Sequence, residues 1–502
     1  MSTEVEIKFV VKPEVKSQLA MLLADYVIIE QAIKPLSNTY FDTTTSQFRQ
    51  FDFGLRTRKS LNFAEQTIKT AGIVRGGLHQ RPEYNLPLLG DVPTLADFPA
   101  EIWPNGTNIA QLQADLVDLF TTDFERTMWH IKLANDAEIE VVFDQGMARS
   151  GEQSYPICEI ELELVRGDIT DLFTLAQQIT QLGNVRLGNV SKAKRGYQLA
   201  GLYTPKIKPL ALKMPTLACQ GLKTESLTDI FLATLTQSYA HWQHHEQQYL
   251  ETQDITALAE VDAAVALILQ TMQSYAAILP DIDLSKAELV WLQQQLSAVS
   301  CASQLHQVML TNGQFMRKLP EYKRIGKELE ALQTRYVDFT DIETLFNSPR
   351  YASIMLSVSQ LLSQGLSSVK LDTANVLSFA NAHLQTSWQS VLDSQLSAPV
   401  LTLSDYLGLQ EKLRQNLLIG HCFSHHYRPE RRDKFRLPWQ DILQGIDDLA
   451  ILQVLMDVAQ QQPPAITVQI EKLILRKQRS LLDALEQTRL QALTMRPYWL
   501  ED

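Results

Sequence analysis

Charged and apolar residues alternate strictly at the start of the chain, in residues 4–8 (Glu-Val-Glu-Ile-Lys). Because successive side chains of a β-strand point to opposite faces, the two glutamates and the lysine share one face of such a strand. The same acidic spacing returns at residues 159–163 and 138–140, and a basic version stands at residues 56–58. Several strands with like charges on one face are hard to explain as separate solvated surfaces. Inside one closed sheet they would form a site for divalent cations and for a polyanion.

The N-terminal half also carries bases placed to meet an anion: Arg56, Arg58, Lys69, Arg81, Arg126, Lys192 and Arg195. Their donors match the oxygens of phosphate groups. The acidic residues cannot bind such an anion directly, but they can hold Mg²⁺ or Mn²⁺, which prefer carboxylate oxygen. Together the two sets predict a metal-assisted site for a polyphosphate.

Strands must position these residues, because the chain up to about Tyr203 reads as short strands separated by turns. About eight strand-like segments follow one another at short spacing, which is typical of an antiparallel barrel. They are residues 3–11, 37–41, 53–59, 62–70, 77–86, 124–133, 137–143 and 157–165. Prolines then crowd residues 204–220, which indicates an extended linker. Beyond it, apolar residues recur at helical spacing. We therefore predict an α+β fold: an eight-stranded antiparallel β-barrel at 1–203, a Pro-rich linker at 204–220 and a separate all-α helical bundle at 221–502.

Composition limits the class of protein. With 502 residues, 45% of them hydrophobic and 20% charged, the chain is an ordinary globular protein large enough for several domains. A net charge of −12 argues against a nucleic-acid partner bound through a basic surface. Four dispersed cysteines, an N-terminus without a signal-peptide pattern and the lack of an apolar run long enough for a membrane span predict a cytoplasmic protein with no membrane partner. The oligomeric state is open.

The chain resembles the CYTH superfamily, the triphosphate tunnel metalloenzymes. Residues 4–8 match that family's E-x-E-x-K signature. The further residues that follow in the family's order, over roughly residues 2–203, are Arg56, Arg58, Lys69, Arg81, Arg126, Asp144, Glu161, Glu163 and Lys192. The helical half resembles a CHAD domain, and the arrangement is similar to bacterial CYTH–CHAD inorganic triphosphatases. Residues 76–85 and 102–106 look like that subgroup in particular.

The resemblance implies a charged tunnel that hydrolyses inorganic triphosphate to diphosphate and phosphate with the help of Mg²⁺ or Mn²⁺. It implies metal ligands at Glu4, Glu6, Glu161 and Glu163, with Glu159 ranked below them because it lies near the start of its strand. It implies phosphate binding by Arg56, Arg58, Lys69, Arg81, Arg126 and Lys192, with Arg195 as a further candidate. Lys8 and Asp144 would orient the nucleophile or its neighbours.

Other activities stay open within the same fold: a thiamine or nucleoside triphosphatase, or a class IV adenylyl cyclase. The sequence offers no clear aromatic slot for a base, which favours a bare polyphosphate. A non-catalytic polyphosphate-binding adaptor is the alternative from another class, but a pure anion binder gains nothing from metal-binding acids. The helical half departs from the CHAD pattern at residues 260–270, which contain no arginine, so we expect it to bind long polyphosphate weakly.

Overall fold

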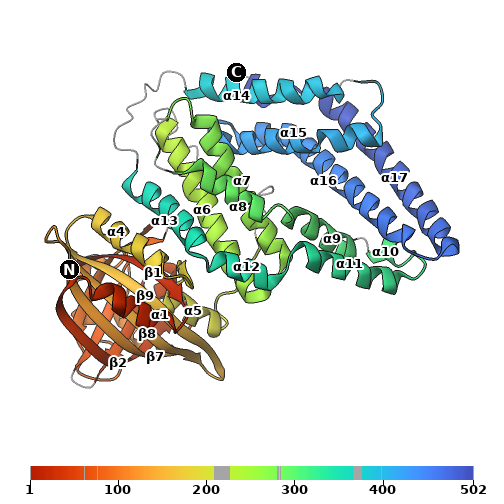
Figure 1. Ribbon diagram of the computed structural model, residues 1–502. Helices are drawn as coiled ribbons and strands as arrows, with labels where there is room; N and C mark the ends of the chain where they lie inside the picture. The colour runs from red at the N-terminus through yellow and green to blue at the C-terminus, as the bar shows by residue number, and fades with distance from the viewer. Residues whose placement is uncertain are drawn as a thin grey trace. The chain divides into compact units, whose positions relative to one another are not determined.

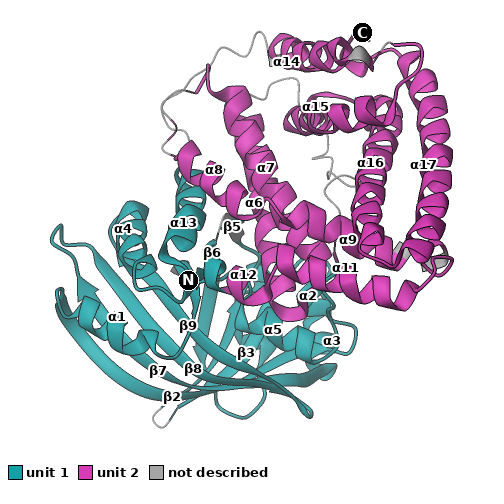
Figure 2. Cartoon of the chain, turned by 45° about the vertical axis from the view of Figure 1, so that its right-hand side comes forward, with its two compact units in different colours: residues 1–206, 344–365 teal, residues 207–343, 366–502 magenta. Residues whose placement is uncertain are grey.

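The computed structural model describes residues 2–60, 63–75, 77–207, 227–279, 282, 284–311, 313–365, 376–396 and 398–500. The chain divides into two compact units, which Figure 2 draws in different colours. Unit 1 comprises residues 1–206 and 344–365, and unit 2 comprises residues 207–343 and 366–502. Most of the predicted linker, from residue 208 onward, lies outside the described residues.

One antiparallel sheet dominates unit 1. Its strands are β1 (Ser2–Val11), β2 (Val27–Thr43), β3 (Gly54–Lys59), β4 (Ala64–Lys69), β5 (Ile73–Arg75), β6 (Leu78–Pro87), β7 (Leu116–Lys132), β8 (Glu138–Ser150), β9 (Gln153–Arg166) and β10 (Val185–Leu187). They follow the order β10-β1-β9-β8-β7-β2-β3-β4-β6-β5, and β1 also pairs with β6. That last pairing closes eight strands into the barrel of Figure 1, while β5 and β10 lie beside β6 and β1. The prediction of an eight-stranded antiparallel barrel is confirmed.

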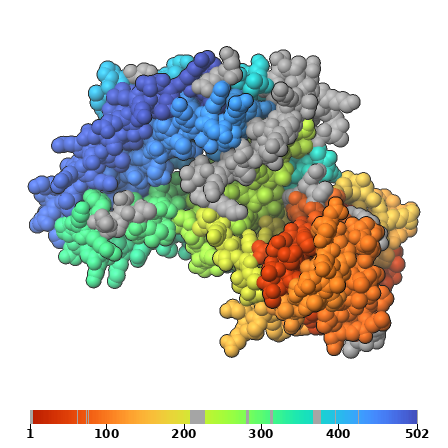
Figure 3. Space-filling model, turned by 180° about the vertical axis from the view of Figure 1, so that it is seen from behind, coloured from red at the N-terminus to blue at the C-terminus, as the bar shows by residue number. Residues whose placement is uncertain are grey.

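Apolar residues of the strands form the core outside the barrel wall. Ile7 and Phe9, which alternate with the charged residues of β1, are fully buried. The helix α4 (Ile169–Thr180) contacts β1 and β9, and α1 (Val15–Leu23) buries its own apolar residues. Elsewhere on the wall, residues 95–112 pack Leu95, Phe98 and Trp103 against β2, β3 and β4. Figure 3 shows the first strands of unit 1, in red and orange, gathered into one rounded body.

Strand β2 is longer than the sequence predicts. The prediction placed a strand only at residues 37–41, whereas β2 begins at Val27. Its first part carries exposed apolar residues, including Val27, Ile29 and Ile33, in place of a clear polar face. Because period-two alternation is the signal of a half-buried strand, this stretch escaped recognition. Its pairing with β7 across residues 27–43 is what holds it in the sheet.

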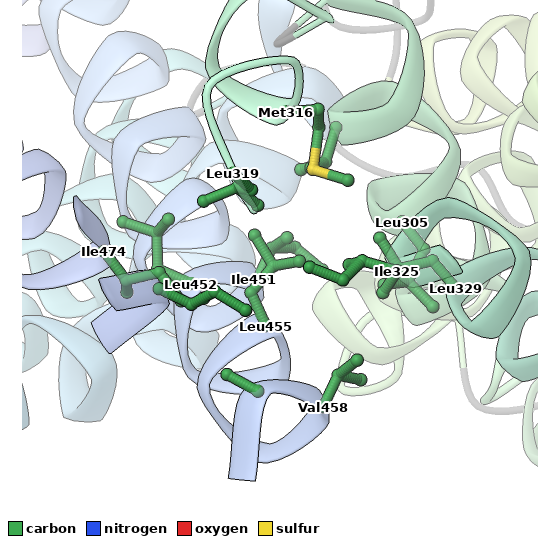
Figure 4. Close-up of a cluster of buried hydrophobic side chains, with 13 residues drawn as sticks. Leu305, Met316, Leu319, Ile325, Leu329, Ile451, Leu452, Leu455, Val458 and Ile474 are labelled. Atoms are coloured by element: carbon green, nitrogen blue, oxygen red, sulfur yellow. The ribbon is translucent and has the colours of Figure 1, made fainter. Parts of the chain in front are cut away.

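Unit 2 is helical, as predicted. Its helices are α6 (Leu227–Thr252), α7 (Ile255–Tyr275), α8 (Lys286–Gln295), α9 (Val299–Thr311), α10 (Gly313–Met316), α11 (Tyr322–Tyr336), α12 (Phe339–Phe346, which ends in unit 1), α14 (Val376–Val391), α15 (Leu403–Cys422), α16 (Pro429–Gln460) and α17 (Pro464–Leu493). Figure 4 shows one core of this unit, in which Leu305, Ile325, Leu455 and Ile474 bring α9, α11, α16 and α17 together.

Helix α7 has the length and composition of a membrane span, with a mean hydropathy of 1.5 over its most apolar stretch. The expectation that no segment qualifies was therefore too strict. However, 61% of that stretch is buried in the protein, and α7 packs against α6, α8, α9 and α15. A core helix of a helical domain has the same properties, so α7 gives only weak support for a membrane location.

One helix from late in the chain belongs to unit 1. Helix α13 (Pro349–Gln364) runs beside α4 in Figures 1 and 2 and contacts α4 and β10. The side-chain amides of Gln177 and Gln181 donate to the Ser353 hydroxyl at 3.0 and 2.9 Å. The compact units therefore do not follow chain order. The boundaries at 203 and 221 stay a prediction about which parts fold independently.

Candidate active site

Charged residues of the barrel strands converge on its lumen. Directly opposite residues of an antiparallel pair point to the same side of the sheet. The register places Glu6 of β1 opposite Glu163 of β9, and Lys8 opposite Glu161. On the next pairs, Asp144 of β8 lies opposite Glu159 of β9, and Arg126 of β7 lies opposite Asp144. One face of these four strands thus carries acids and bases together, as the period-two spacing predicted.

Three cations surround the carboxylates of Asp144 and Glu161. The guanidinium of Arg126 donates to both oxygens of Asp144 at 2.8 and 2.7 Å and to Glu161 at 3.0 Å. Lys8 Nζ lies 2.7 Å from Glu161, and Lys192 Nζ lies 2.8 Å from Asp144 and 3.1 Å from Glu161. Lys192 also pairs with Glu159. Asp144 is completely buried, so these ion pairs are what keep its charge stable there.

The pKa values in this cluster follow from that arrangement. Burial alone would raise the pKa of Glu161, but Lys192, Lys8 and Arg126 hold it well below its ordinary value. The pKa of Asp144 is lowered as well, since Lys192 and Arg126 outweigh its burial. Burial raises the pKa of Glu159 to about 7, and the neighbouring charge of Glu161 adds to the shift. Glu161 and Asp144 are therefore ionised anchors for the three cations.

A second group of acids has fewer cations. Burial raises the pKa of Glu163 to about 8, and the carboxylates of Glu4, Glu140 and Glu6 reinforce the shift. Burial also raises the pKa of Glu4, although Lys69 opposes the change. Like charges gathered in a buried site raise one another's pKa, and a divalent cation relieves that repulsion. This group therefore fits a bound divalent cation.

A different acidic set, Asp144, Glu159 and Glu161, meets a purely geometric criterion for a metal site, since one oxygen from each lies within 4.8 Å of the others. Lys8, Lys192 and Arg126 already neutralise those carboxylates. We therefore favour the group around Glu163, where the negative charge is in excess.

The opposite wall of the lumen holds the remaining bases. Lys69 pairs with Glu4 and lies 3.2 Å from Glu83, and Arg56 lies 3.3 Å from Glu83. Although burial opposes it, these two bases lower the pKa of Glu83 to about 2. Burial lowers the pKa of Arg58 to about 10, and the positive charges of Arg56 and Arg126 add to the effect. Positive charges this close together favour a bound anion.

The structure brings most of the predicted site residues together in the lumen: Glu4, Glu6, Lys8, Arg56, Arg58, Lys69, Arg126, Asp144, Glu159, Glu161, Glu163 and Lys192. Two lie apart from the charged centre. Arg81 is opposite Glu4 in the register, but its guanidinium donates to both oxygens of Asp52 at 3.1 and 3.2 Å. Arg195 lies with its guanidinium 4.0 Å from the centre of the Tyr155 ring.

Other lumen residues were not predicted. Glu83 and Glu140 share the charged face, and both stood in sequence patterns that were noticed but not assigned to the site. Asn38 accepts a hydrogen bond from Arg58 Nε at 2.9 Å, and Tyr40 bonds the side chain of Arg56. Both neighbours are neutral, and only the pairing of β2 with β3 brings them to the arginines. No sequence signal would have found them.

Comparison with known proteins supports the same region. Residues 2–197 match the CYTH domain family. An inorganic triphosphatase from Haemophilus influenzae is 38% identical over 204 residues, which make up 40% of this chain and 55% of that protein. The chain thus matches about half the length of that curated relative.

The similarity to solved structures is weaker. A Hippeastrum protein, HpAC1, described with a dominant triphosphatase activity, is 16% identical with a TM-score of 0.30, covering 40% of this chain and 98% of that one. The CHAD domain of Ricinus communis is 17% identical with a TM-score of 0.43, covering 57% of this chain and 98% of that one. Both TM-scores are low, so the assignment depends on the sequence match. Residues 2–197, which form the barrel and carry its charged lumen, are the part of the chain that matches the CYTH domain family.

Proposed function

We propose that this protein is an inorganic triphosphatase that hydrolyses tripolyphosphate to diphosphate and phosphate in the barrel lumen. The observation that carries the proposal is the pairing, within one closed barrel, of a carboxylate group with excess negative charge and a cluster of arginines with excess positive charge. A divalent cation would neutralise the excess negative charge of the carboxylates, and a polyanion would neutralise the excess positive charge of the arginines. The curated relative over the same residues is an inorganic triphosphatase, which supports this substrate.

In this proposal Glu4, Glu6 and Glu163 are the main ligands of Mg²⁺ or Mn²⁺. Glu161 and Glu159 lie beside them and pair with Lys8 and Lys192 before an ion binds. When bound, such an ion supplies positive charge to the phosphate oxygens and acidifies a coordinated water. Arg56, Arg58, Lys69, Arg126 and Lys192 bind the phosphate groups and neutralise the charge that moves to the leaving diphosphate. Arg81 and Arg195 act from the periphery, since Asp52 and Tyr155 engage them.

Hydrolysis requires a water oxygen to attack a terminal phosphorus while the anhydride bond to the leaving diphosphate breaks. Lys8 and Asp144 orient that water or the groups around it. Asp144 suits this role because two cations fix its carboxylate in the ionised form. The proton of the water leaves to solvent or to a lumen carboxylate.

A bare triphosphate fits better than a substituted one. The aromatic rings of Tyr40, Phe120 and Tyr197 pack on one another, with 4.5 Å between the ring centres of Tyr40 and Phe120 and 5.7 Å between those of Phe120 and Tyr197. Rings packed in this way have less free surface on which a base or a thiazole could stack. This is a reason to place tripolyphosphate ahead of nucleoside or thiamine triphosphate and ahead of a cyclase reaction.

A substrate panel tests the proposal. Phosphate release is measured with tripolyphosphate, ATP, thiamine triphosphate and diphosphate, each with Mg²⁺, with Mn²⁺ and with a chelator. We expect the highest kcat/KM for tripolyphosphate and no turnover with the chelator. A higher kcat/KM for ATP or thiamine triphosphate would assign one of the alternative activities, and tight binding of tripolyphosphate without turnover would assign an adaptor.

Compartment is also a proposal. The described cysteines Cys158, Cys301 and Cys422 are free thiols, as expected in a reducing cytoplasm. Cell fractionation, followed by detection of the full chain with an antibody, tests this location.

A further inference from the structure

Helix α5 (Lys192–Leu199) brings a base into the lumen from beyond the last barrel strand. It begins at Ser191, whose hydroxyl accepts the N–H of Lys194 at 3.1 Å, and it contacts β7, β8 and β9. Its first residue, Lys192, is only 9% exposed and reaches Asp144, Glu159 and Glu161. A helix of eight residues is too short to be stable alone, so its tertiary contacts must hold it.

The other end of α5 is held by a single buried carboxylate. The Tyr197 hydroxyl donates to Asp42 Oδ2 at 2.7 Å. Asp42 is completely buried at the end of β2. Its oxygens also accept the backbone N–H groups of Thr43, Phe48 and Arg49 at 2.7, 2.9 and 3.1 Å. Because the turn around α2 (Gln47–Gln50) fixes this acceptor, the hydrogen bond fixes the ring of Tyr197 relative to the barrel wall.

Close packing restricts α5 to one position. The Tyr197 ring meets the Phe120 ring edge-on at 5.7 Å. At Gly196 an added Cβ would lie 2.0–2.3 Å from Phe120 ring atoms, so only glycine lets the helix approach this closely. The guanidinium of Arg49 covers Tyr197 at 5.5 Å. The C-terminal half of α5 is thus fixed against the barrel wall, and the N-terminal end of the helix places Lys192 in the lumen.

We infer that Tyr197 is a positioning residue that, through its hydrogen bond to Asp42, holds Lys192 in the lumen. Lys192 is attracted to three carboxylates before substrate binds. When a polyphosphate enters, the ammonium must turn from those acids toward the phosphate oxygens. Once the ammonium has left the carboxylates, the packing of α5 against the barrel wall determines whether Lys192 stays close enough to bind the phosphate oxygens. This last step rests on the proposed function, whereas the holding of Lys192 does not.

Chemical labelling tests the position of Lys192 without any turnover. The full chain is acylated with a limiting amount of acetic anhydride, and mass spectrometry gives the modified fraction of each lysine relative to Lys16, which is more exposed. We expect Tyr197→Phe to raise the labelling of Lys192 at least about threefold, since one buried hydrogen bond is lost. Tyr26→Phe is the control for loss of a tyrosine hydroxyl, because Tyr26 donates a hydrogen bond of the same length, 2.7 Å, to Gln178 of α4. Equal labelling of Lys192 in both variants would overturn the inference.

A double-mutant cycle tests the consequence for the reaction. Lys192→Ala should lower kcat/KM for tripolyphosphate strongly, and Tyr197→Phe should lower it roughly three- to tenfold. If Tyr197 acts through Lys192, adding Tyr197→Phe to Lys192→Ala should cost little more. Additive losses would show that Tyr197 affects the reaction independently of Lys192, which would overturn the inference. If the unmodified protein leaves tripolyphosphate intact, the proposed function fails, and the labelling result still decides the role of Tyr197.

Discussion

Glu161 and Glu163 stand two residues apart on β9, yet their pKa values move in opposite directions. Glu161 faces three cations, whereas Glu163 faces mainly other acids. The same residue type therefore has two environments on one strand. In the proposed function, Glu161 holds the bases that meet phosphate, and Glu163 belongs to the carboxylates that bind the metal ion.

Removing a metal ligand should abolish most of the turnover. We expect Glu4→Gln or Glu6→Gln to lower kcat at least about a hundredfold at saturating Mg²⁺, with the fold intact, because the metal loses a charged ligand. Calorimetric titration with Mg²⁺ should show weaker binding, and thermal stability without metal should rise as repulsion falls. Glu125→Gln is the control, since Glu125 precedes Arg126 on β7 but pairs with Lys16 outside the lumen. Near-normal turnover of either lumen variant would refute the ligand assignment.

The bases should matter according to their position in the lumen. Arg56→Ala and Arg58→Ala each remove charge-assisted hydrogen bonds worth about 1.5–3 kcal/mol, so kcat/KM for tripolyphosphate should fall roughly ten- to over a hundredfold. Arg81→Ala should have a smaller effect, because Asp52 already engages its guanidinium. Steady-state kinetics of the three variants compare them directly. A larger loss of kcat/KM in the Arg81 variant than in the other two would show that the Arg81 side chain turns into the lumen.

A partly buried carboxylate in unit 2, Asp262, gives a prediction about pH. Burial raises the pKa of Asp262 from 3.8 to about 7, and Arg414 only partly opposes it. Between those two pH values the folded state binds more protons than the unfolded state, so the free energy of unfolding falls as the pH rises from about 4 to 7. Asp262→Asn should flatten this dependence and stabilise the protein at pH 8 by about 1–2 kcal/mol. Denaturant unfolding at pH 5 and 8 checks it, and equal slopes for both proteins would refute the shift.

At this scale the sequence predicts charged lumen residues well and neutral ones poorly. On β1 and β9 the two faces of the strand differ sharply in polarity, so spacing alone identifies the lumen side. The position of Arg81 depends on Asp52, a turn residue whose nearness no strand pattern can reveal. Asn38 and Tyr40 carry no charge, so their contacts with Arg58 and Arg56 come only from the neighbouring strand.

The position of helix α5 depends on the absence of a side chain at Gly196. Gly196→Ala would place a methyl group against the Phe120 ring, and the helix would have to shift. We expect a loss of about 1–3 kcal/mol in unfolding free energy and the same rise in Lys192 labelling as in Tyr197→Phe. Gly326→Ala on α11 is the control, because open space surrounds that position. A Gly196→Ala variant as stable as the control would show that the Phe120 ring can move aside at no cost, which would contradict this prediction.

The strands show what periodicity can and cannot predict about elements. The strand at residues 3–11 was predicted because one of its faces is charged and the other apolar. The first ten residues of β2 were missed because apolar side chains there remain exposed and Pro35 interrupts the pattern. Pairing with β7 fixes this stretch in the sheet. Pairing between segments far apart in the chain cannot be recognised from the local sequence pattern.

For the whole molecule, the question is whether the barrel works alone. All proposed site residues lie between Glu4 and Arg195, so a fragment ending near Tyr203 should bind metal and hydrolyse tripolyphosphate. That fragment lacks α13, whose Ser353 receives hydrogen bonds from Gln177 and Gln181 of unit 1. We therefore expect it to unfold at a lower temperature than the full chain. Calorimetry and phosphate release on both proteins measure the two effects.

Ser353→Ala in the full chain removes the same two hydrogen bonds without removing α13. We expect a small loss of stability with unchanged kcat. A folded but inactive fragment would mean that residues beyond 203 form part of the site. Chain order could not reveal the docking of α13, since its sequence reads as one more helix of the second half. Its contacts with α4 and β10 place it in unit 1.

The most direct test of the central claim is ³¹P NMR of tripolyphosphate incubated with the full chain. With Mg²⁺ or Mn²⁺ we predict that diphosphate and phosphate appear in equal amounts. With excess chelator, or with Glu6→Gln, the tripolyphosphate signals should persist. Intact tripolyphosphate in the presence of Mg²⁺ and Mn²⁺, or cleavage at the same rate in chelator, would contradict a metal-dependent triphosphatase site in the lumen.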